Sequence, residues 1–334
     1  MAQGTIWAIS DGTAGMVNQA LGLAEAIADR AGPDWRVVGK RIAPRLPWSL
    51  LPGEVWPPGV SGTGPGSDRL DPPWPDLVVS CGRHAIGPAL HVKRRSFGDT
   101  FIVHAQHPRL AVLRYDLAIA QSHDRLGGRN VVTVMGSMNR VTGERLRDAA
   151  ARFGERFAAL PRPLVAVMVG GSNSSYRMTP AVARRLAEEL RRLVDETGAG
   201  LLVTTSRRTG TENEAVLQAA LAGKTAYFWD GGGENPYFAF LALADAIIVT
   251  SDSVNMVSEA CVTGKPVLVA TLDGGSGKFE RFHAEMHAAG HTRPFRGRIE
   301  RWARAPLDET GRAAAEVLRR YRARVEGDRS PQRT

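Results

Sequence analysis

The apolar positions of this chain form short continuous runs, and these alternate with longer stretches in which apolar and polar positions follow a helical period. Such runs predict buried β-strands, and the stretches between them predict amphipathic helices. The predicted strands are residues 5–9, 36–41, 76–80, 101–105, 117–120, 131–135, 164–169, 200–205, 226–229, 246–250 and 266–270. The predicted helices are residues 16–31, a segment that ends near 95, and residues 144–159, 179–196, 212–222, 235–244, 253–263 and 307–325.

This alternation predicts an α/β protein in which parallel sheets are covered by helices on both faces. The segment Pro161-Arg162-Pro163 separates two such series, and its prolines favour an extended linker. We therefore expect two Rossmann-like, doubly wound domains, one over residues 1–160 and one over residues 161–306. Residues 307–334 are expected to form a basic helix and tail that packs back on the first domain.

One segment departs from this rhythm. Residues 44–75 contain nine of the 20 prolines and three of the seven tryptophans, which predicts a long irregular insertion. Two interpretations remain open for it, a variable surface loop or a contact with a membrane or an acceptor lipid.

The composition narrows the class of protein. No run of about 18 apolar residues occurs, so no transmembrane helix is expected. The first residues resemble a strand and a turn, not a signal peptide. The two cysteines, Cys81 and Cys261, lie far apart and fit a reducing compartment. We expect a cytoplasmic protein, with a peripheral position at the inner face of the cytoplasmic membrane as an alternative.

The net charge of +9 comes mainly from arginine. It reflects either a GC-rich genome or attraction to anionic phosphates and membrane surfaces. No zinc finger or RNP motif is present, so nucleic acid is not an expected partner.

Ligands of parallel sheets bind beyond the carboxyl ends of the strands, so the loops there are the candidate sites. In the second half, a helix that begins near Ser253 offers free N–H groups to an anion, and Glu259 can accept hydrogen bonds from ribose hydroxyls. The loop 170–174 combines glycines with small polar donors, and Arg207 follows a third strand. The candidate nucleotide and donor residues are Gly170, Gly171, Ser172, Asn173, Ser206, Arg207, Ser251, Asp252, Ser253, Met256 and Glu259. For each loop the alternative is an ordinary turn or helix cap.

The first half carries a different set of strand-end residues. Asp11 lies in a glycine loop that opens a helix, where a carboxylate disfavours phosphate but suits a general base. His84 is a second candidate base, and the alternative for Asp11 is a helix cap. The candidate acceptor-side residues are Gly12, Gly15, Arg83 and Gln106.

Several chemistries lack their motif. The segment 274–278 does not complete a Walker loop, and no YxxxK pair or GxSxG motif is present. His283, His287 and His291 share a helical spacing that Gly290 interrupts, so they do not predict a metal site. No metal and no cofactor are expected.

At this point six segments together carry a family resemblance. They are DGTAG (11–15), VVSCGR (78–83), VGGSN (169–173), TSRRT (205–209), TSDSVNMVSEA (250–260) and KFERFH (278–283). Over about residues 4–320 the chain resembles the bacterial branch of the mitochondrial-fission "elongated mitochondria" family. Members of that family are also grouped with glycosyltransferases, and bacterial members are often labelled nucleoside-diphosphate-sugar epimerases.

The resemblance implies a GT-B-like fold, in which two Rossmann-like domains face each other across a cleft. It implies a nucleotide-diphosphate sugar bound by the C-terminal domain and an acceptor, such as a lipid-linked or anionic molecule, bound by the N-terminal domain. GT-B enzymes generally need no catalytic metal, because helix N-termini and basic groups stabilise the leaving diphosphate.

Three functions follow in order of preference. The first is a metal-independent glycosyltransferase that acts on a cell-envelope or lipid-linked acceptor. The second is a non-catalytic scaffold at a membrane surface, in which the basic tail helix and the Trp-rich segment are the working surfaces. The third is a nucleotide-sugar 2-epimerase on the same fold.

Overall fold

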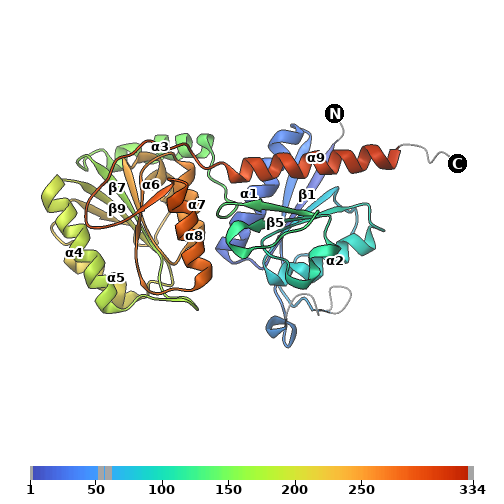
Figure 1. Cartoon of the computed structure of the whole chain (residues 1–334), viewed down its shortest axis with the longest axis horizontal. Coiled ribbons are helices and arrows are strands. Elements are labelled where there is room, and N and C mark those ends of the chain that lie inside the picture. Colours follow the sequence, from blue (N-terminus) through green and yellow to red (C-terminus); the bar gives the residue numbers. More distant parts are fainter. Residues whose placement is uncertain (1–2, 52–55, 57–61, 330–334) are drawn as a thin grey trace. The chain divides into compact units, whose positions relative to one another are not determined.

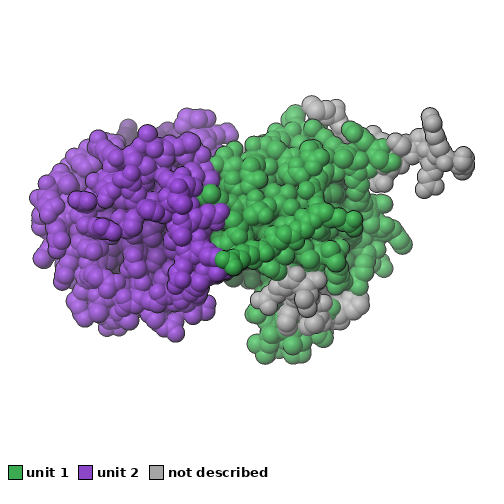
Figure 2. Space-filling model, viewed as in Figure 1, with its two compact units in different colours: residues 1–140, 308–334 green, residues 141–307 purple. Residues whose placement is uncertain are grey.

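The computed structural model describes residues 3–51, 56 and 62–329 of the chain. Contacts within the chain divide it into two compact units (Figure 2). Unit 1 comprises Met1–Arg140 and Asp308–Thr334, and unit 2 comprises Val141–Leu307. Among the described residues, no helix is both long enough and apolar enough to cross a bilayer.

Unit 1 is built on a parallel sheet of six strands in the order β2-β1-β3-β4-β5-β6. The strands are β1 (Gly4–Ser10), β2 (Trp35–Arg41), β3 (Leu77–Cys81), β4 (Phe101–Ala105), β5 (Leu117–Gln121) and β6 (Val131–Val134). The helices are α1 (Ala14–Ala31), α2 (Ile86–Arg95), α9 (Glu309–Arg329) and the short 3-10 helices η1 (Trp48–Leu50), η3 (Arg83–Ala85), η4 (Arg109–Arg114) and η5 (Ser122–Asp124).

Both faces of this sheet are covered. Alternate residues of β1 point to opposite faces, as a strand requires. Ile6 and Ala8 join a core formed with α1 and α9, whereas Trp7 and Ile9 join a second core with α2. Figure 1 shows α9 lying along α1. The C-terminal helix therefore completes the hydrophobic core of the first unit.

Unit 2 is built on a second parallel sheet of six strands, in the order β10-β9-β7-β11-β12-β14. The strands of unit 2 are β7 (Leu164–Val169), β8 (Tyr176–Arg177), β9 (Gly200–Thr205), β10 (Ala226–Phe228), β11 (Ala246–Thr250), β12 (Val267–Ala270), β13 (Asp273–Gly274) and β14 (Thr292–Pro294). The helices are α3 (Gly143–Phe157), α4 (Pro180–Thr197), α5 (Thr211–Ala220), α6 (Tyr237–Leu243), α7 (Val254–Val262) and α8 (Gly277–Ala288).

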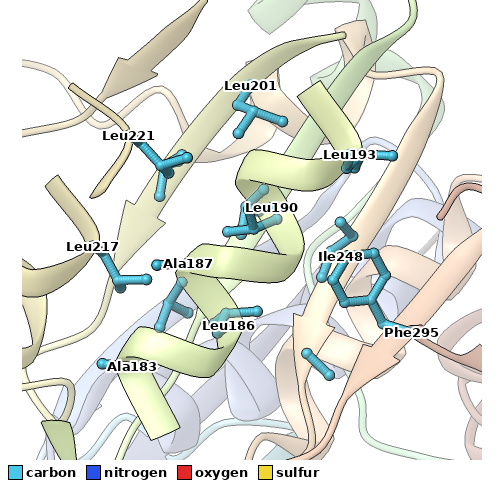
Figure 3. Close-up of a cluster of buried hydrophobic side chains, with 14 of the residues drawn as sticks. Ala183, Leu186, Ala187, Leu190, Leu193, Leu201, Leu217, Leu221, Ile248 and Phe295 are labelled. Atoms are coloured by element: carbon cyan, nitrogen blue, oxygen red, sulfur yellow. The ribbon is translucent and has the colours of Figure 1, made fainter. Parts of the chain in front are cut away.

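The core of unit 2 follows from the apolar stripe of α4. Leu186, Leu190 and Leu193 are buried against strand residues such as Leu201 and Ile248 (Figure 3). Pro180 occupies the first turn, and the Thr179 side chain accepts a hydrogen bond from the Val182 amide, so the helix starts where its sequence predicts. The fold class predicted from sequence, two parallel-sheet α/β domains of the GT-B type, is confirmed.

The units meet in the sequence at Arg140/Val141, earlier than the predicted linker at Pro161-Arg162-Pro163. The reason is the packing of α3. Phe157 of this helix contacts Tyr227 and Phe240, with ring centroids 4.9 and 5.5 Å apart, and so holds α3 in unit 2. The edge strand β14 and the antiparallel pair β8–β13 were not predicted.

The Trp-rich insertion turns most of its aromatic surface inward. Trp56 is 7% exposed, and Trp48 and Trp74 pack against the same core of unit 1. The tail helix likewise uses many of its cations internally, since Arg312 pairs with Glu309, and Arg319 and Arg320 both pair with Glu316. Residues 52–55, 57–61 and 330–334 of these two segments lie outside the described residues.

Candidate functional site

The three predicted donor loops lie together at the C-terminal ends of the strands of the unit 2 sheet. We call this end of a sheet its carboxyl edge, and the opposite end its amino edge. The three loops follow β9, β7 and β11, which are consecutive neighbours in the sheet. Because all three strands are parallel, their carboxyl ends lie at one edge, and the loops that follow them are adjacent.

Asp252 connects these three loops. Its Oδ2 accepts from the Gly171 amide at 3.0 Å and lies 2.8 Å from Nη2 of Arg208, while its Oδ1 accepts from Thr250 Oγ1 at 2.7 Å. The Asp252 side chain is fully buried, whereas that of Arg208 is 41% exposed. The predicted donor residue Asp252 therefore acts inside the unit, where one carboxylate fixes the ends of three strands.

The two glycines of the first loop are required by this close packing. A Cβ at Gly170 would lie 2.2 Å from Asp252 Oδ1, and a Cβ at Gly171 would lie 2.0 Å from the carbonyl oxygen of Arg208. The Gly170 amide donates to Thr250 Oγ1, so both glycine N–H groups are bonded within the unit. Their small size serves internal contact, and their amides are not open donors for a phosphate.

The rest of that loop is also held from within. Ser172 Oγ accepts from the Met178 amide at 2.9 Å. Asn173 Oδ1 accepts from the amides of Ser175 and Tyr176, both at 2.8 Å, and its Nδ2 donates to the Asp252 carbonyl. These hydrogen bonds within the unit hold the loop in one conformation at the carboxyl edge.

The helix start after β11 has the geometry of an anion site. Ser253 is the N-cap of α7, and its Oγ accepts from the Met256 amide at 3.3 Å. An α-helix begins with N–H groups that have no partner in its own first turn, and its dipole favours negative charge there.

Ser251, beside this cap, is buried. Its Oγ accepts from the Leu272 amide at 3.0 Å, and its carbonyl accepts from Nε2 of His283 at 2.8 Å. Burial lowers the pKa of His283, although the Ser251 carbonyl and Asp252 oppose this shift, so the ring is neutral near pH 7. The hydrogen bonds of Ser251 therefore lie inside unit 2 and stabilise the loop that follows β11.

The loop after β9 places two arginines in different environments. Arg208 pairs with Asp252, as described above, whereas Arg207 is exposed and makes no ion pair within the described part of the chain. Ser206 Oγ accepts from the Arg208 amide at 3.2 Å and so fixes the turn. Arg207 is thus the predicted donor residue that is most open to a ligand.

Glu259 accepts a hydrogen bond that the sequence did not predict. It is 6% exposed, and Tyr237 of α6 donates its hydroxyl to Glu259 Oε2 at 2.5 Å. Burial raises the pKa of Tyr237, and the neighbouring carboxylate raises it further, so the phenol remains a donor. This hydrogen bond helps to orient the Glu259 carboxylate on α7.

At the carboxyl edge of the unit 1 sheet, the two predicted catalytic residues are in contact. His84 Nδ1 lies 3.1 Å from Asp11 Oδ2, although the residues are 73 positions apart. Asp11 follows β1 and His84 lies in η3 after β3, and these strands are neighbours in the sheet. Their side chains are 17% and 13% exposed, so the pair is partly accessible.

The surroundings of Asp11 keep it ionised. Burial raises the pKa of its carboxyl, but hydrogen bonds from the Thr13 side chain, the Thr13 amide and His84 outweigh this effect and leave the pKa below its ordinary value. Thr13 contributes its hydroxyl at 2.7 Å and its amide at 3.0 Å. Asp11 therefore closes the turn that precedes α1, but the N-cap of that helix is Thr13 and not Asp11.

Arg83 is hydrogen-bonded to the other ring nitrogen of His84. Its Nε donates to His84 Nε2 at 3.0 Å, and its Nη2 donates to the Ser49 carbonyl at 3.1 Å. Trp56 lies beside the ring, with centroids 6.0 Å apart. Asp11, His84 and the predicted acceptor-side residue Arg83 thus form one connected group.

The remaining acceptor-side residues have separate roles. Gln106 follows β4 and has φ +125°, an unusual conformation for a residue with a side chain. Gly12 has φ +82° and lies close to the Arg41 side chain, and Gly15 belongs to α1. Within the described residues, no group of three or more His, Cys, Asp or Glu side chains is arranged to hold a metal ion.

The chain is similar to known proteins over most of its length. The family model for mitochondrial fission ELM1 matches residues 14–321. The mitochondrial fission protein ELM1 of Arabidopsis thaliana is 32% identical over 277 residues, which are 75% of this chain and 65% of the plant protein. An uncharacterized protein of Rickettsia prowazekii is 22% identical over 299 residues, which are 79% of this chain and 82% of that protein. This chain therefore spans about two thirds of the plant relative.

Solved structures match the fold at low sequence identity. The UDP-GlcNAc 2-epimerase of Methanocaldococcus jannaschii is 13% identical, with a TM-score of 0.59 over 94% of this chain and 98% of that one. The same enzyme in complex with UDP-GlcNAc and UDP matches with a TM-score of 0.55, 13% identity and the same coverage. These likenesses establish the two-unit α/β fold.

Proposed function

Because the chain belongs to the mitochondrial fission ELM1 family and has the fold of nucleotide-sugar enzymes, we propose that it is a glycosyltransferase that uses a nucleotide-diphosphate sugar. In this proposal unit 2 holds the donor and unit 1 activates the acceptor. The fold neighbour from Methanocaldococcus jannaschii binds UDP-GlcNAc and UDP, which supports a donor of this class.

One observation carries the donor assignment. The carboxyl edge of unit 2 combines a capped helix start, an exposed arginine and a buried carboxylate at three adjacent strand ends. The α7 N-terminus and Arg207 suit the diphosphate, and Glu259 suits the ribose hydroxyls. The contacts of Asp252 keep these groups in place before the ligand binds, which lowers the cost of binding.

The acceptor assignment rests on the Asp11–His84 pair. If Nδ1 of His84 donates its proton to Asp11, Nε2 is left as the basic nitrogen. During transfer the bond from the sugar to the diphosphate breaks, a bond to the acceptor oxygen forms, and His84 takes the proton of that oxygen. Arg83 must first leave Nε2, and Asp11 stabilises the imidazolium that results. Arg207 and the helix start stabilise the leaving diphosphate in place of a metal.

A thermal-shift screen of the full chain against UDP, GDP, ADP, CMP and TDP, with and without Mg²⁺, tests the donor site. A ligand at about 100 times its Kd stabilises the folded state by roughly 2.7 kcal/mol, a measurable shift. We expect one diphosphate to bind without metal. Arg207→Ala is expected to weaken that binding by roughly 10-fold or more through the lost charge-assisted hydrogen bonds.

Arg191→Ala is the matched control, because it removes an exposed arginine from the middle of α4. Ser253→Asp is expected to repel the diphosphate at the helix start and to weaken binding. If no nucleotide shifts the melting temperature of the wild-type protein, the transferase proposal fails.

Epimerisation is the alternative that the fold neighbours favour, because several of them are UDP-GlcNAc 2-epimerases. The two reactions differ in their need for an acceptor. An epimerase converts the nucleotide sugar by itself, whereas a transferase releases the nucleoside diphosphate only when an acceptor is present. NMR of the nucleotide sugar incubated with protein alone separates the two, and a changed sugar would replace the proposed transfer by epimerisation.

A further inference from the structure

The amino edge of the unit 1 sheet carries two strongly exposed apolar side chains. Phe97 is 96% exposed and lies between α2 and β4. Leu113 is 82% exposed and lies in η4, just before β5. Both therefore precede a strand, on the edge opposite the Asp11–His84 pair.

The two loops are held together by Asp116. Lys93 of α2 donates to Asp116 Oδ1 at 2.7 Å and to the Arg114 carbonyl at 3.3 Å. Arg324 of α9 lies 3.4 Å from the same Oδ1 and also donates to the Gly98 carbonyl. The end of α2, the end of η4 and the tail helix thus converge, and Phe97 and Leu113 project from one region of the surface.

Cationic side chains surround these two residues. Arg94, Arg95 and Arg114 are exposed, and none of them makes an ion pair within the part of the chain that the structure describes. Of the acids in this region, Asp99 is exposed, and the charge of Asp116 is balanced by Lys93 and Arg324. Asp71 lies close enough to influence His91, as Arg94 and Arg95 do, and its charge is paired with that of Arg69. We call Phe97, Leu113, Arg94, Arg95 and Arg114 the amino-edge patch, and its net charge is positive.

The backbone at Phe97 gives a further reason to assign a role to this patch. Phe97 has φ +54° at the end of α2, in the left-handed region that glycine occupies most easily and that is unusual for a bulky residue. Its ring contributes nothing to a core, because it lies almost wholly in water. A costly backbone conformation that presents an exposed aromatic ring points to function outside the fold.

The shape and charge of the amino-edge patch indicate the kind of partner that it binds. Its apolar groups are single side chains that project from loops, and unpaired arginines stand beside them. At a bilayer surface such side chains insert between the headgroups, while arginines bind lipid phosphates. We propose that the amino-edge patch docks this protein on a membrane surface rich in anionic phospholipid, with Phe97 and Leu113 inserted. Docking through this edge leaves the Asp11–His84 pair, on the opposite edge of the sheet, uncovered.

Co-sedimentation of the full chain with lipid vesicles tests the proposal. We expect binding to vesicles of equal parts phosphatidylglycerol and phosphatidylcholine, and little binding to pure phosphatidylcholine. The double variant Phe97→Ser/Leu113→Ser is expected to lose roughly 10-fold or more in affinity through the lost apolar insertion. Arg94→Gln/Arg95→Gln is expected to lose a similar factor through the lost attraction to lipid charge.

Leu46→Ser/Leu50→Ser is the matched control. Leu46 and Leu50 are 72% and 73% exposed, and they lie in the segment that reaches His84 at the other edge of the sheet. This variant is expected to bind vesicles like the wild type. All three variants change exposed side chains, so unchanged thermal unfolding checks that they fold.

Three results would overturn the proposal. The first is wild-type protein that does not bind anionic vesicles, and the second is a loss of binding in the control variant but not in the patch variants. The third is a patch variant that changes a dimer to a monomer in light scattering while vesicle binding persists, which would make the patch a protein interface. Nucleotide binding enters none of these measurements, so the docking proposal and the transferase proposal fail independently.

Discussion

Each unit places an aspartate just beyond the carboxyl end of a strand, but the two aspartates have different surroundings. Asp252 of unit 2 is fully buried and bonded to Gly171, Thr250 and Arg208. Asp11 of unit 1 is partly exposed and bonded to Thr13 and His84. The same position relative to a parallel sheet can therefore hold a structural group or a group available for chemistry. The difference lies in whether neighbouring loops cover the carboxylate.

Removal of Asp252 is expected to have the largest effect on stability. Asp252→Ala leaves a buried amide, a buried hydroxyl and the Arg208 cation without their acceptor, which is expected to cost about 3 kcal/mol or more. Asp11→Ala is the matched substitution in unit 1 and is expected to cost about 1 kcal/mol, because water can replace the lost contacts. Urea unfolding of both variants measures the difference, and equal losses would remove the distinction between the two sites.

A methyl group at Gly171 sharpens the same comparison by testing how tightly the unit 2 edge is packed. Gly171→Ala places its Cβ against the Arg208 carbonyl, a backbone atom that cannot rotate away. We expect a loss of about 2 to 3 kcal/mol from overpacking. Gly154→Ala in α3 is the control, because a Cβ there meets no atom within 4 Å and alanine favours the helix by up to about 1 kcal/mol. A neutral Gly171→Ala variant would show that the edge is loosely packed.

The smallest expected effect is the pH dependence contributed by Asp11. Its hydrogen bonds outweigh burial and lower its pKa in the folded state, so the unfolded chain binds this proton more readily. The stabilisation is fully present above the ordinary aspartate pKa of about 3.9 and is lost as the pH falls through the lower folded value. The stability difference between wild type and Asp11→Asn is expected to be about 1 kcal/mol or less near pH 6 and to shrink as the pH falls below about 3.9. Urea titrations across this range measure it, and a difference that grows toward acid would reverse the assigned sign.

Much of the fold is encoded locally in the sequence. The strands β4, β7, β9 and β11 have the bounds that their apolar runs predict, because each run is continuous and ends at polar or glycine residues. The edge strand β14 was missed because its three residues, Thr292–Pro294, form no apolar run. The unit boundary was misplaced because the contact of Phe157 with Tyr227 and Phe240 joins residues far apart in the sequence.

The candidate sites were predictable in position but not in detail. The rule that ligands bind at strand ends brought together the residues that follow β7, β9 and β11, and it also brought Asp11 to His84. This rule does not predict which polar groups form hydrogen bonds within the protein and are therefore closed to a ligand. Asp252 reaches Gly171 across 81 positions, and Tyr237 reaches Glu259 from another helix. Such pairings depend on the register of packed elements, which residue types alone do not specify.

The return of α9 to unit 1 has a consequence for the order in which the protein is made. The core around α1 is completed by Ala313, Ala314 and Val317, residues that a ribosome adds only after all of unit 2. During synthesis the apolar stripe of α1 therefore stays exposed, or is bound by a chaperone, until the residues of α9 have been added after unit 2. A chain that lacks residues 313–317 would therefore contain all of unit 2 but would leave the unit 1 core open along α1.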